Sequence, residues 1–347
     1  MRLLIYEYCC AGGGGRGLLA PEGRAMLQAL VADAVNGGGL EVVVLVVDGL
    51  RLALPAGVRV LPVTAGRELE ALVAAAATAD AVLIVAPETE GILTSRVAAV
   101  RAAGATVLAP SPAFIEIASD KQATIRALAA AGVPVPAGRS LAAGEPWPEA
   151  FTRPAVRKPL DGTGADGFVV VCRGAAPPPP ARRPTRIEAF VTGMAVGVSC
   201  LCGPRGVYPL PALRQVFATT GSPIAYAGCD PLPDRLVAAR AEALARRAVH
   251  AVARAAGGAT PATGWIGVDM ILGERSDGRG DRVLEINPRV TTSFVGHASG
   301  LSGGLVRAML DVGTGRETMP PASGRISPRS FRLSSDVHAS ADRSRGG

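Results

Sequence analysis

Residues 283–289 have the sequence VLEINPR, and residues 264–272 upstream have the sequence GWIGVDMIL. Both runs are mostly apolar, and a polar, glycine-rich segment separates them. Two apolar runs around such a turn predict a β-hairpin. When the hairpin is centred on Asp277, Asp269 falls opposite Glu285, and this pairing fixes the expected register of the two strands.

Three oxygen-bearing side chains are expected to converge on one face of this hairpin. Side chains alternate between the faces of a strand, so Glu285 and Asn287 share a face. Directly opposed residues of an antiparallel pair also share a face, which adds Asp269. Carboxylate and amide oxygens are donors that Mg²⁺ or Mn²⁺ prefers. A solvated polar face is the alternative, but the apolar neighbours Val268 and Ile286 indicate a buried element, where an uncompensated carboxylate pair is costly.

The composition indicates a multidomain protein without a membrane segment. The 347 residues suffice for two or three domains. Mean hydropathy is +0.30, but the most apolar run, residues 71–86, is interrupted by Thr78 and Asp80 and is shorter than the roughly 20 residues of a membrane span. The chain start is too short for a signal-peptide apolar region. The six cysteines form no paired CxxC motifs, so we expect reduced thiols in a cytoplasmic protein.

The charge of +7 comes almost entirely from arginine, since Lys121 and Lys158 are the only lysines in the sequence. Asparagine is equally scarce and occurs as Asn36 and Asn287. Because the composition avoids lysine, each remaining lysine is a candidate for a role that needs a compact, mobile charge. The arginines are scattered without interleaved aromatic residues, so the positive charge does not indicate nucleic-acid binding.

Residues 1–110 alternate strand-like and helix-like segments, which predicts a mostly parallel sheet covered by helices. The expected strands are residues 3–6, 42–47, 59–63, 81–85 and 106–108. The expected helices are residues 20–35, 68–78 and 94–103.

A glycine run at residues 12–17 follows the first of these strands. It satisfies the pattern G-x-G-x-x-G through Gly12, Gly14 and Gly17, and Asp48 ends the next strand, as in dinucleotide-binding proteins. A glycine run matches this pattern by chance, and the interval to Asp48 is long. We therefore favour a substrate loop, with an NAD-linked oxidoreductase as an alternative function.

Both lysines lie at positions suited to phosphate binding. Lys121 is inside a predicted helix, residues 113–131, and Lys158 ends a short strand before the glycine-rich turn 160–167. Glycine lets backbone N–H groups point inward around a phosphate group, whose charge a nearby lysine neutralises. The lysine precedes the glycines, so this is not a P-loop, and a plain hairpin turn is the alternative.

The remaining segments complete the expected organisation. Residues 177–184 predict an exposed linker, residues 186–201 a strand, and residues 236–256 an amphipathic helix. Apolar periodicity ends near Glu317, and the rest of the chain has the composition of a disordered tail.

The order of these motifs resembles the ATP-grasp superfamily of ligases over roughly residues 1–315. The residues that carry the resemblance are Lys121, Lys158, the glycine loop 162–167, the segment 188–193, Asp269 and the segment 285–289. The resemblance implies ATP and Mg²⁺ or Mn²⁺ as cofactors and an α/β fold, α+β in its C-terminal part. It divides the chain into a Rossmann-like pre-ATP-grasp domain (1–110), two ATP-grasp subdomains (111–185 and 186–316) and a tail (317–347).

The same resemblance implies a role for each matching residue. Lys121 and Lys158 correspond to phosphate-binding lysines, and Asp269, Glu285 and Asn287 to metal ligands. Further nucleotide-binding residues are the loop residues Gly162, Thr163, Gly164 and Gly167, and the adenine-hinge residues Glu188, Ala189, Phe190 and Val191. Two positions depart from the pattern, because residues 194–196 lack a ribose-binding carboxylate and Gly267 replaces a common arginine. Arg289, or else Arg214, is then expected to stabilise charge in the transition state, although either could be a surface arginine.

Residues 3–8, 21–27 and 287–296 are more particularly similar to tyramine–glutamate ligases of methanofuran-type cofactor synthesis. The resemblance implies a carboxylate–amine ligase that forms an amide through an acyl phosphate. Its partners would be a small acid and a small amine, and a homodimer is compatible with it. Another ATP-grasp amino-acid or peptide ligase, and a non-catalytic nucleotide-binding protein, are the alternatives within the fold.

Overall fold

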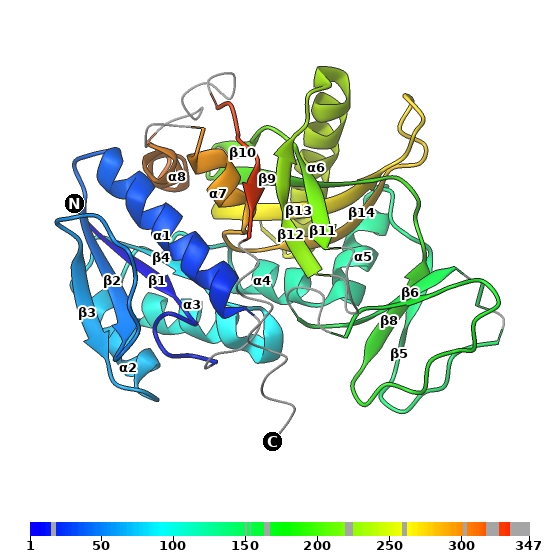
Figure 1. Cartoon of the computed structure of the whole chain (residues 1–347), viewed down its shortest axis with the longest axis horizontal. Coiled ribbons are helices and arrows are strands. Elements are labelled where there is room, and N and C mark those ends of the chain that lie inside the picture. The colour runs from blue at the N-terminus through cyan, green and yellow to red at the C-terminus, as the bar shows by residue number, and fades with distance from the viewer. Residues whose placement is uncertain are drawn as a thin grey trace.

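The computed structural model describes residues 1–14, 19–149, 151–152, 154–162, 167–218, 225–258, 262–300, 304–316 and 326–333. These residues form three β-sheets, with helices packed between and around them. Figure 1 shows the first sheet at the left, the second sheet at the lower right, and the largest sheet between them.

The first sheet is parallel and has the strand order β3-β2-β1-β4. Its strands are β1 (Arg2–Glu7), β2 (Glu41–Val47), β3 (Arg59–Val63) and β4 (Ala81–Val85). Because strand side chains alternate, Leu3 and Ile5 pack on α1 (Ala20–Asn36), whereas Leu4 and Tyr6 pack on the opposite helices. Those opposite helices are α2 (Glu68–Ala76) and α3 (Ile92–Ala102), and a short 3₁₀ helix, η1 (Thr89–Gly91), precedes α3.

The parallel sheet and its helices confirm the prediction for this part of the chain, apart from the last strand. Residues 106–108 contribute a single bridge, between Val107 and Val82 of β4. All six cysteines are free thiols.

The single helix predicted over residues 113–131 is wrong, because two helices form: α4 (Pro112–Ser119) and α5 (Lys121–Ala130). Asp120 between them has extended backbone angles, and its Oδ1 accepts from the N–H groups of Gln122 and Ala123 at 2.7 and 2.8 Å. A capping aspartate starts a helix at the next residue. Lys121 is therefore the first residue of α5, and its own N–H donates to Leu160 O at 2.9 Å.

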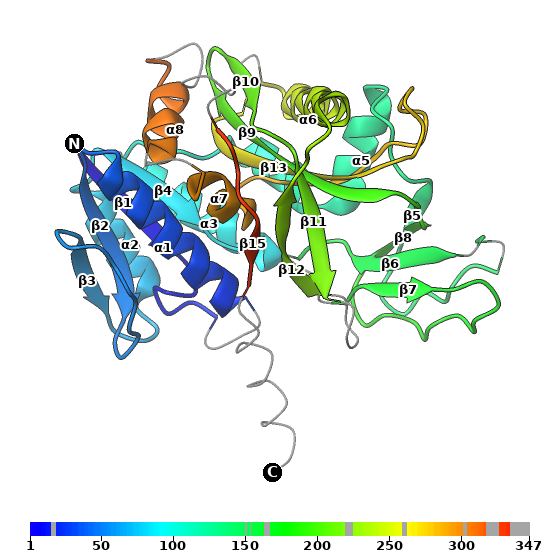
Figure 2. The ribbon, with the colours of Figure 1, turned by 45° about the horizontal axis from the view of Figure 1, so that its top comes forward.

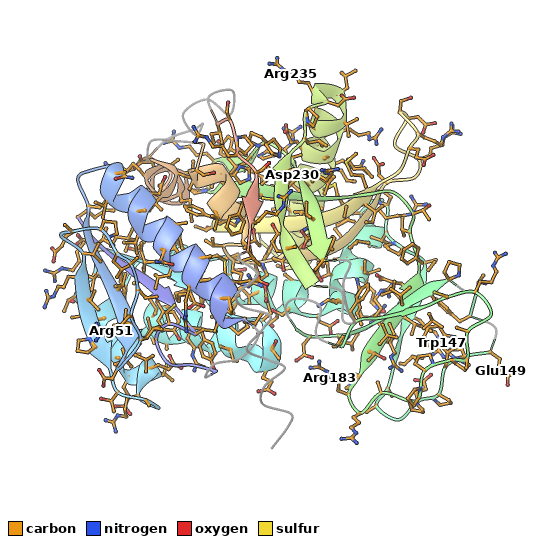
Figure 3. All side chains as sticks on the ribbon, viewed as in Figure 1. Arg51, Trp147, Glu149, Arg183, Asp230 and Arg235 are labelled. Carbon is orange, nitrogen blue, oxygen red and sulfur yellow. The ribbon has the colours of Figure 1, made fainter. Side chains whose placement is uncertain are left out.

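The second sheet is antiparallel, with the strand order β5-β8-β6-β7. Its strands are β5 (Gly138–Leu141), β6 (Ala155–Pro159), β7 (Val169–Val171) and β8 (Thr185–Ala189). They cover a small core in which Trp147 packs edge-to-face on Phe151, and Figure 3 labels Trp147 at the lower right. The boundary predicted between residues 185 and 186 falls inside β8.

The prediction of a single strand over residues 186–201 is also wrong. Two strands form there, β8 and β9 (Met194–Gly203), and they belong to different sheets. Gly193 between them has φ +146°, and a Cβ there would lie 2.3 Å from Leu272 O. The glycine allows the chain to cross between sheets at this point.

The third sheet contains the predicted hairpin and has the order β14-β13-β9-β11-β12-β15, with β10 on β9. Its other strands are β10 (Gly206–Pro209), β11 (Leu213–Ala218), β12 (Ala225–Pro231), β13 (Gly264–Leu272), β14 (Arg282–Asn287) and β15 (Phe331–Arg332). The helix α6 (Arg235–Ala255) covers one face through an alanine- and valine-rich core. This helix agrees with the prediction for residues 236–256.

The first and third sheets share one apolar core. Leu27 of α1 packs in it with Phe294 of α7 (Ser293–Ala298) and Met309 of α8 (Leu305–Gly313). Figure 2 shows these three helices lying together beside the first sheet. The shared core brings the carboxyl ends of β1 and β4 against the end of β14.

The predicted tail is ordered in part. Residues 326–333 are described, and their strand β15 pairs with β12, so the prediction of disorder is wrong there. Residues 317–325 and 334–347 lie outside the described part of the chain. No described helix is long and apolar enough to span a membrane.

Candidate active site

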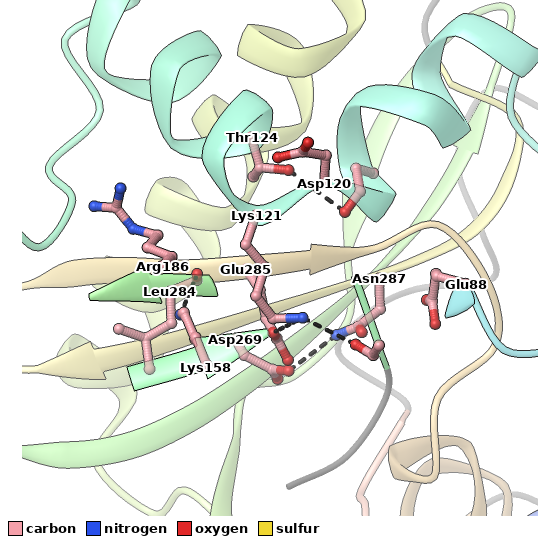
Figure 4. Close-up of polar contacts among 12 residues, drawn as sticks. Glu88, Asp120, Lys121, Thr124, Lys158, Arg186, Asp269, Leu284, Glu285 and Asn287 are labelled. Carbon is pink, nitrogen blue, oxygen red and sulfur yellow. Dashed lines mark hydrogen bonds and ion pairs between the residues drawn. The ribbon is translucent and has the colours of Figure 1, made fainter. Parts of the chain in front are cut away.

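Away from the turn, the β13–β14 hairpin has the register predicted from the sequence, whereas the pairs between a β-bulge and the turn are shifted by one residue. Asp269 pairs with Glu285, and Gly267 pairs with Asn287. Asn287 Nδ2 donates to Asp269 Oδ2 at 2.9 Å, so these side chains lie on one face, as Figure 4 shows. Asp269 Oδ1 accepts from Gln215 Nε2 of β11 at 2.7 Å. This glutamine was missed in the sequence, where only its neighbour Arg214 was considered.

The two carboxylates of the hairpin have opposite pKa shifts. Burial, and then the charge of Glu285, raises the pKa of Asp269 to about 7. Burial also acts to raise the pKa of Glu285, but the charges of Lys121 and Lys158 outweigh it and hold the pKa below its usual value. Asp269 is therefore the carboxyl group that lacks a compensating cation.

Both lysines reach this hairpin from other elements. Lys121 Nζ lies 3.4 Å from Glu285 Oε2 and donates to Gly162 O at 2.9 Å. Lys158, at the end of β6, donates through Nζ to Leu284 O at 3.3 Å. The hairpin register shifts next to Leu284, where a β-bulge interrupts the ladder. Two ammonium groups thus approach β14 from α5 and β6.

Lys158 also belongs to a second buried network, which we call the Arg186 network: Gln122, Lys158, Arg186 and Glu188. Lys158 Nζ lies 2.7 Å from Glu188 Oε1, and Arg186 Nε donates to Glu188 Oε2 at 2.9 Å. Arg186 is fully buried and also donates to Gln122 Oε1 at 2.6 Å and to Pro136 O at 3.0 Å. The Glu188 side chain therefore positions Lys158. The sequence held one signal for the pair of Glu188 and Arg186: they lie two residues apart on one strand, and residues with that spacing share a face.

The other predicted nucleotide-binding residues adjoin these networks. In the predicted adenine hinge, the N–H groups of Ala189 and Phe190 donate to Ala137 O and Pro154 O, whereas Val191 lies in the connection to β9. Gly162 and Gly167 have φ of +128° and +73°, as expected of turn glycines. Thr163 and Gly164, and Gly17 of the N-terminal run, lie outside the described residues.

Arg289 follows β14 and faces carboxylates of the N-terminal part. Its Nε lies 3.0 Å from Oε1 of Glu88, which follows β4. Its charge also lowers the pKa of Glu7 and Glu22, although burial is the larger effect and raises both. Glu88 was missed in the sequence, where its position just after a buried parallel strand was the available signal.

Arg214 is not brought to this cluster. It pairs in register with Val196, whose side chain lies in the core on the α6 face of the sheet, opposite the face of Asp269. Its Nη2 lies 2.8 Å from Asp230 Oδ2, and its side chain is 55% exposed; Figure 3 labels Asp230 beside β11 and β12. The one-residue offset from Gln215 explains this, because neighbouring strand residues face opposite ways.

Comparison with known protein families gives two matches. The ATP-grasp domain matches residues 118–293, which make up half of the chain. This chain belongs to the ATP-grasp family. The pre ATP-grasp 3 domain matches residues 42–115, within the first parallel sheet and its helices. The predicted ATP-grasp fold with an N-terminal pre-ATP-grasp domain is therefore confirmed.

Solved structures share this fold at low sequence identity. An ATP-grasp superfamily protein of Archaeoglobus fulgidus is 19% identical with a TM-score of 0.68, covering 96% of this chain and 100% of its own. D-Alanine–D-alanine ligase of Bacillus anthracis, complexed with ATP, is 15% identical with a TM-score of 0.59, covering 90% and 97%. L-Amino acid ligase of Bacillus licheniformis is 15% identical with a TM-score of 0.59, covering 94% and 77%. No curated protein sequence matches the chain.

The hairpin residues fit a divalent cation of the kind that ATP-grasp enzymes use. In the described part of the chain, no three His, Cys, Asp or Glu side chains converge as metal ligands. The donor set here is instead two carboxylates and the amide of Asn287. Burial first and the charge of Glu285 second raise the pKa of Asp269, and a bound cation would supply the positive charge that favours its ionised form.

Proposed function

We propose that this protein is an ATP-dependent carboxylate–amine ligase. The acid's carboxylate attacks the γ-phosphorus of ATP, which gives an acyl phosphate and ADP. The amine then forms the C–N bond as the C–O bond to phosphate breaks. A substrate that binds as an ammonium group first loses one proton to solvent and attacks as the neutral amine; its second proton goes to the released phosphate, which leaves as HPO₄²⁻. Family membership favours ATP over the alternative of an NAD-linked oxidoreductase.

The observation that supports this proposal most is the convergence of Lys121, Lys158 and the carboxylate hairpin from three separate segments. In this mechanism the two lysines leave their carbonyl and carboxylate partners to bind phosphate oxygens. Positioning and charge neutralisation are the main means by which proteins accelerate phosphoryl transfer.

Asp269, Glu285 and Asn287 would hold Mg²⁺, which supplies positive charge to the phosphate groups when bound. The 162–167 loop, with Gly162, Thr163, Gly164 and Gly167, would cover the triphosphate and exclude water from the acyl phosphate. The adenine would lie at residues 188–191, next to Lys158 and its partner Glu188. Arg289 would stabilise charge in the transition state. The geometry gives no support to the same role for Arg214.

The substrates that we propose are glutamate as the acid and tyramine or a related aromatic amine. The similarity of residues 3–8, 21–27 and 287–296 to tyramine–glutamate ligases supports this choice. The names of the D-alanine–D-alanine ligase and the L-amino acid ligase with this fold also favour an amino acid as a substrate.

The test is ADP release with Mg²⁺, L-glutamate and a panel of amines that includes tyramine, followed by mass spectrometry of the product. We expect an amide and stoichiometric ADP. Lys158→Ala should abolish turnover while Arg157→Ala, on the same strand but facing away from Glu188, retains it. ATP binding without ADP release for any acid and amine would instead support a non-catalytic nucleotide-binding protein.

A further inference from the structure

We propose that Glu88, supported by Glu7 and Glu22, forms the subsite that binds the ammonium group of the acceptor amine. The charge of Arg289, the partner of Glu88, also acts on Glu7 and Glu22. This inference rests on the proposed ligase function and names the part of the site that recognises its second substrate. The three carboxylates come from the N-terminal part of the chain, whereas Lys121 and the metal-binding hairpin belong to the ATP-grasp domain.

Glu88 shares a pocket with the residues proposed to bind phosphate and metal. Lys121, Glu285 and Asn287 line that pocket together with Glu88, and Figure 4 shows Glu88 beside Asn287. A group held by Glu88 therefore lies next to the place where the acyl phosphate forms. An attacking nitrogen must occupy such a position, because reacting atoms approach within about 3–3.5 Å before bond formation.

The Glu88 carboxylate is buried but keeps its hydrogen-bonding capacity free. Its side chain is about 5% exposed, and neither oxygen has a hydrogen-bond partner among the described residues. Arg289 Nε lies 3.0 Å from Oε1 without the geometry of a hydrogen bond. Buried carboxylates in folded proteins are normally hydrogen-bonded. An ammonium group, with three N–H donors, is the kind of ligand that satisfies both oxygens.

The surroundings of Glu88 favour a cation over an anion. Glu7 lies against α1, where a Cβ on Gly23 would fall 2.5 Å from Glu7 Oε1. Glu22 accepts from Thr292 Oγ1 at 3.0 Å. Arg289 pairs with Glu88, and its charge also acts on Glu7 and Glu22, so one guanidinium group serves three carboxyl groups. The acid substrate would be repelled here and attracted to the lysines, whereas a positively charged amine would be attracted here.

The test separates the amine step from acyl phosphate formation. Hydroxylamine is mainly uncharged near neutral pH, traps acyl phosphates as hydroxamates, and needs no ammonium subsite. Each variant is assayed with ATP, Mg²⁺ and L-glutamate, once with hydroxylamine and once with tyramine. If wild-type protein uses hydroxylamine but not tyramine, a panel of alkyl amines and amino acids replaces tyramine.

For Glu88→Gln we expect about a 100-fold loss of kcat/KM for the amine, because a buried charge-assisted contact is removed. Hydroxamate formation and the KM for L-glutamate should change by less than about threefold, since neither uses the ammonium subsite. Glu90→Gln is the matched control, since Glu90 is exposed two residues away and undergoes the same chemical change. It should leave both reactions unaltered.

An equal loss of both reactions in Glu88→Gln would overturn the proposal, because it would place Glu88 in acid or ATP binding. No loss in either reaction would overturn it too. If thermal unfolding shows that the glutamine variant is not folded, Glu88→Asp replaces it and should show the same selective loss to a smaller degree. The absence of hydroxamate from wild-type protein with every acid would instead reject the ligase function itself.

Discussion

The largely buried Arg186 network and the half-buried hairpin cluster of Gln215, Asp269, Glu285 and Asn287 are neighbouring polar groups with opposite electrostatic character. In the first, Glu188 lies between two cations, and Arg186 has a partner for each of its three donor nitrogens. In the second, Asp269 and Glu285 lie side by side. The pKa of Asp269 is raised to about 7 by burial and by that neighbour.

This difference indicates that Arg186 and its partners form a structural framework, whereas the hairpin cluster is a site for a ligand. A buried network whose members are all paired rigidifies the structure around it. A buried carboxylate pair without enough positive charge destabilises the folded protein, and a bound cation reverses that effect. We therefore expect substitution of Arg186, which is not among the proposed ATP-binding residues, to change stability with and without ligand alike. Lys158 and Glu188 of the same network are proposed to bind ATP, so their substitution should also change the response to MgATP. Substitutions in the hairpin cluster should change the response to MgATP.

The largest expected effect is that of Arg186→Leu, which leaves the acceptors on Gln122, Pro136 and Glu188 without their donor. Breaking a buried pair by removing one partner costs about 3–5 kcal/mol. Urea unfolding should show this loss to the same extent with and without MgATP. Arg157→Leu on β6 is the control, because among the described residues its side chain donates one hydrogen bond, to Pro179 O. It should cost less than about 1 kcal/mol. A loss confined to the MgATP-bound protein would remove the distinction between the two regions.

The next effect is that of Asp269→Asn, which removes the uncompensated carboxylate. Turnover should fall by about 100-fold or more, since even residues that only support metal ligands affect affinity by 10–100-fold. The protein without metal should be no less stable than the wild type, because two like charges no longer adjoin. ADP release measures the turnover, and thermal unfolding with and without MgATP measures the stability. A large loss of stability in the absence of ligand would instead show that Asp269 has a structural role like that of Arg186.

The same residue predicts a pH dependence. In the folded protein the pKa of Asp269 is about 7. Between about pH 4 and pH 7, Asp269 is therefore ionised in the unfolded chain but protonated in the folded protein. The unfolded chain then binds fewer protons, so stability without metal should fall as pH rises through this window. The fall should be shallower in Asp269→Asn. Urea unfolding of both proteins from pH 4.5 to 7.5, in the presence of a chelator, checks the sign. Parallel curves would contradict it.

The hairpin cluster was more predictable from the sequence than its partners. Counting outward from Asp277 gave the pairing of Asp269 with Glu285, but it did not reveal the β-bulge at Leu284, which shifts the pairs nearer the turn by one residue. The scarcity of lysine pointed to Lys121 and Lys158, which both approach the hairpin. Their roles in catalysis remain predictions.

What the sequence did not reveal depends on local backbone geometry or on distant packing. The break at Asp120 was missed, since helical spacing continues across it while its side chain caps the second helix. Gly193 separates two strands that read as one. Glu88 and Arg289 are about 200 residues apart in the sequence, and no local pattern contains the packing that brings them together.

A smaller effect is expected for Gln215→Leu, which removes the donor to Asp269 Oδ1 but keeps both carboxylates. Residues that orient a metal ligand typically contribute 10–100-fold in metal affinity. The Mg²⁺ concentration for half-maximal turnover should rise by about tenfold. The maximal rate at saturating Mg²⁺ should change less. An unchanged Mg²⁺ requirement would show that Gln215 does not support Asp269.

The smallest effect is expected for Arg214→Ala, one residue away on the same strand. Arg214 contributes a half-exposed ion pair with Asp230, and Arg332 Nη2 also contacts Asp230 at 2.8 Å. Exposed pairs contribute roughly 0–1 kcal/mol. Turnover and Mg²⁺ requirement should therefore stay within about twofold of wild type. Because strand residues alternate faces, Arg214 and Gln215 form a matched pair. A loss in Arg214→Ala equal to that in Gln215→Leu would mean that position along β11, rather than the face of the sheet, determines the effect.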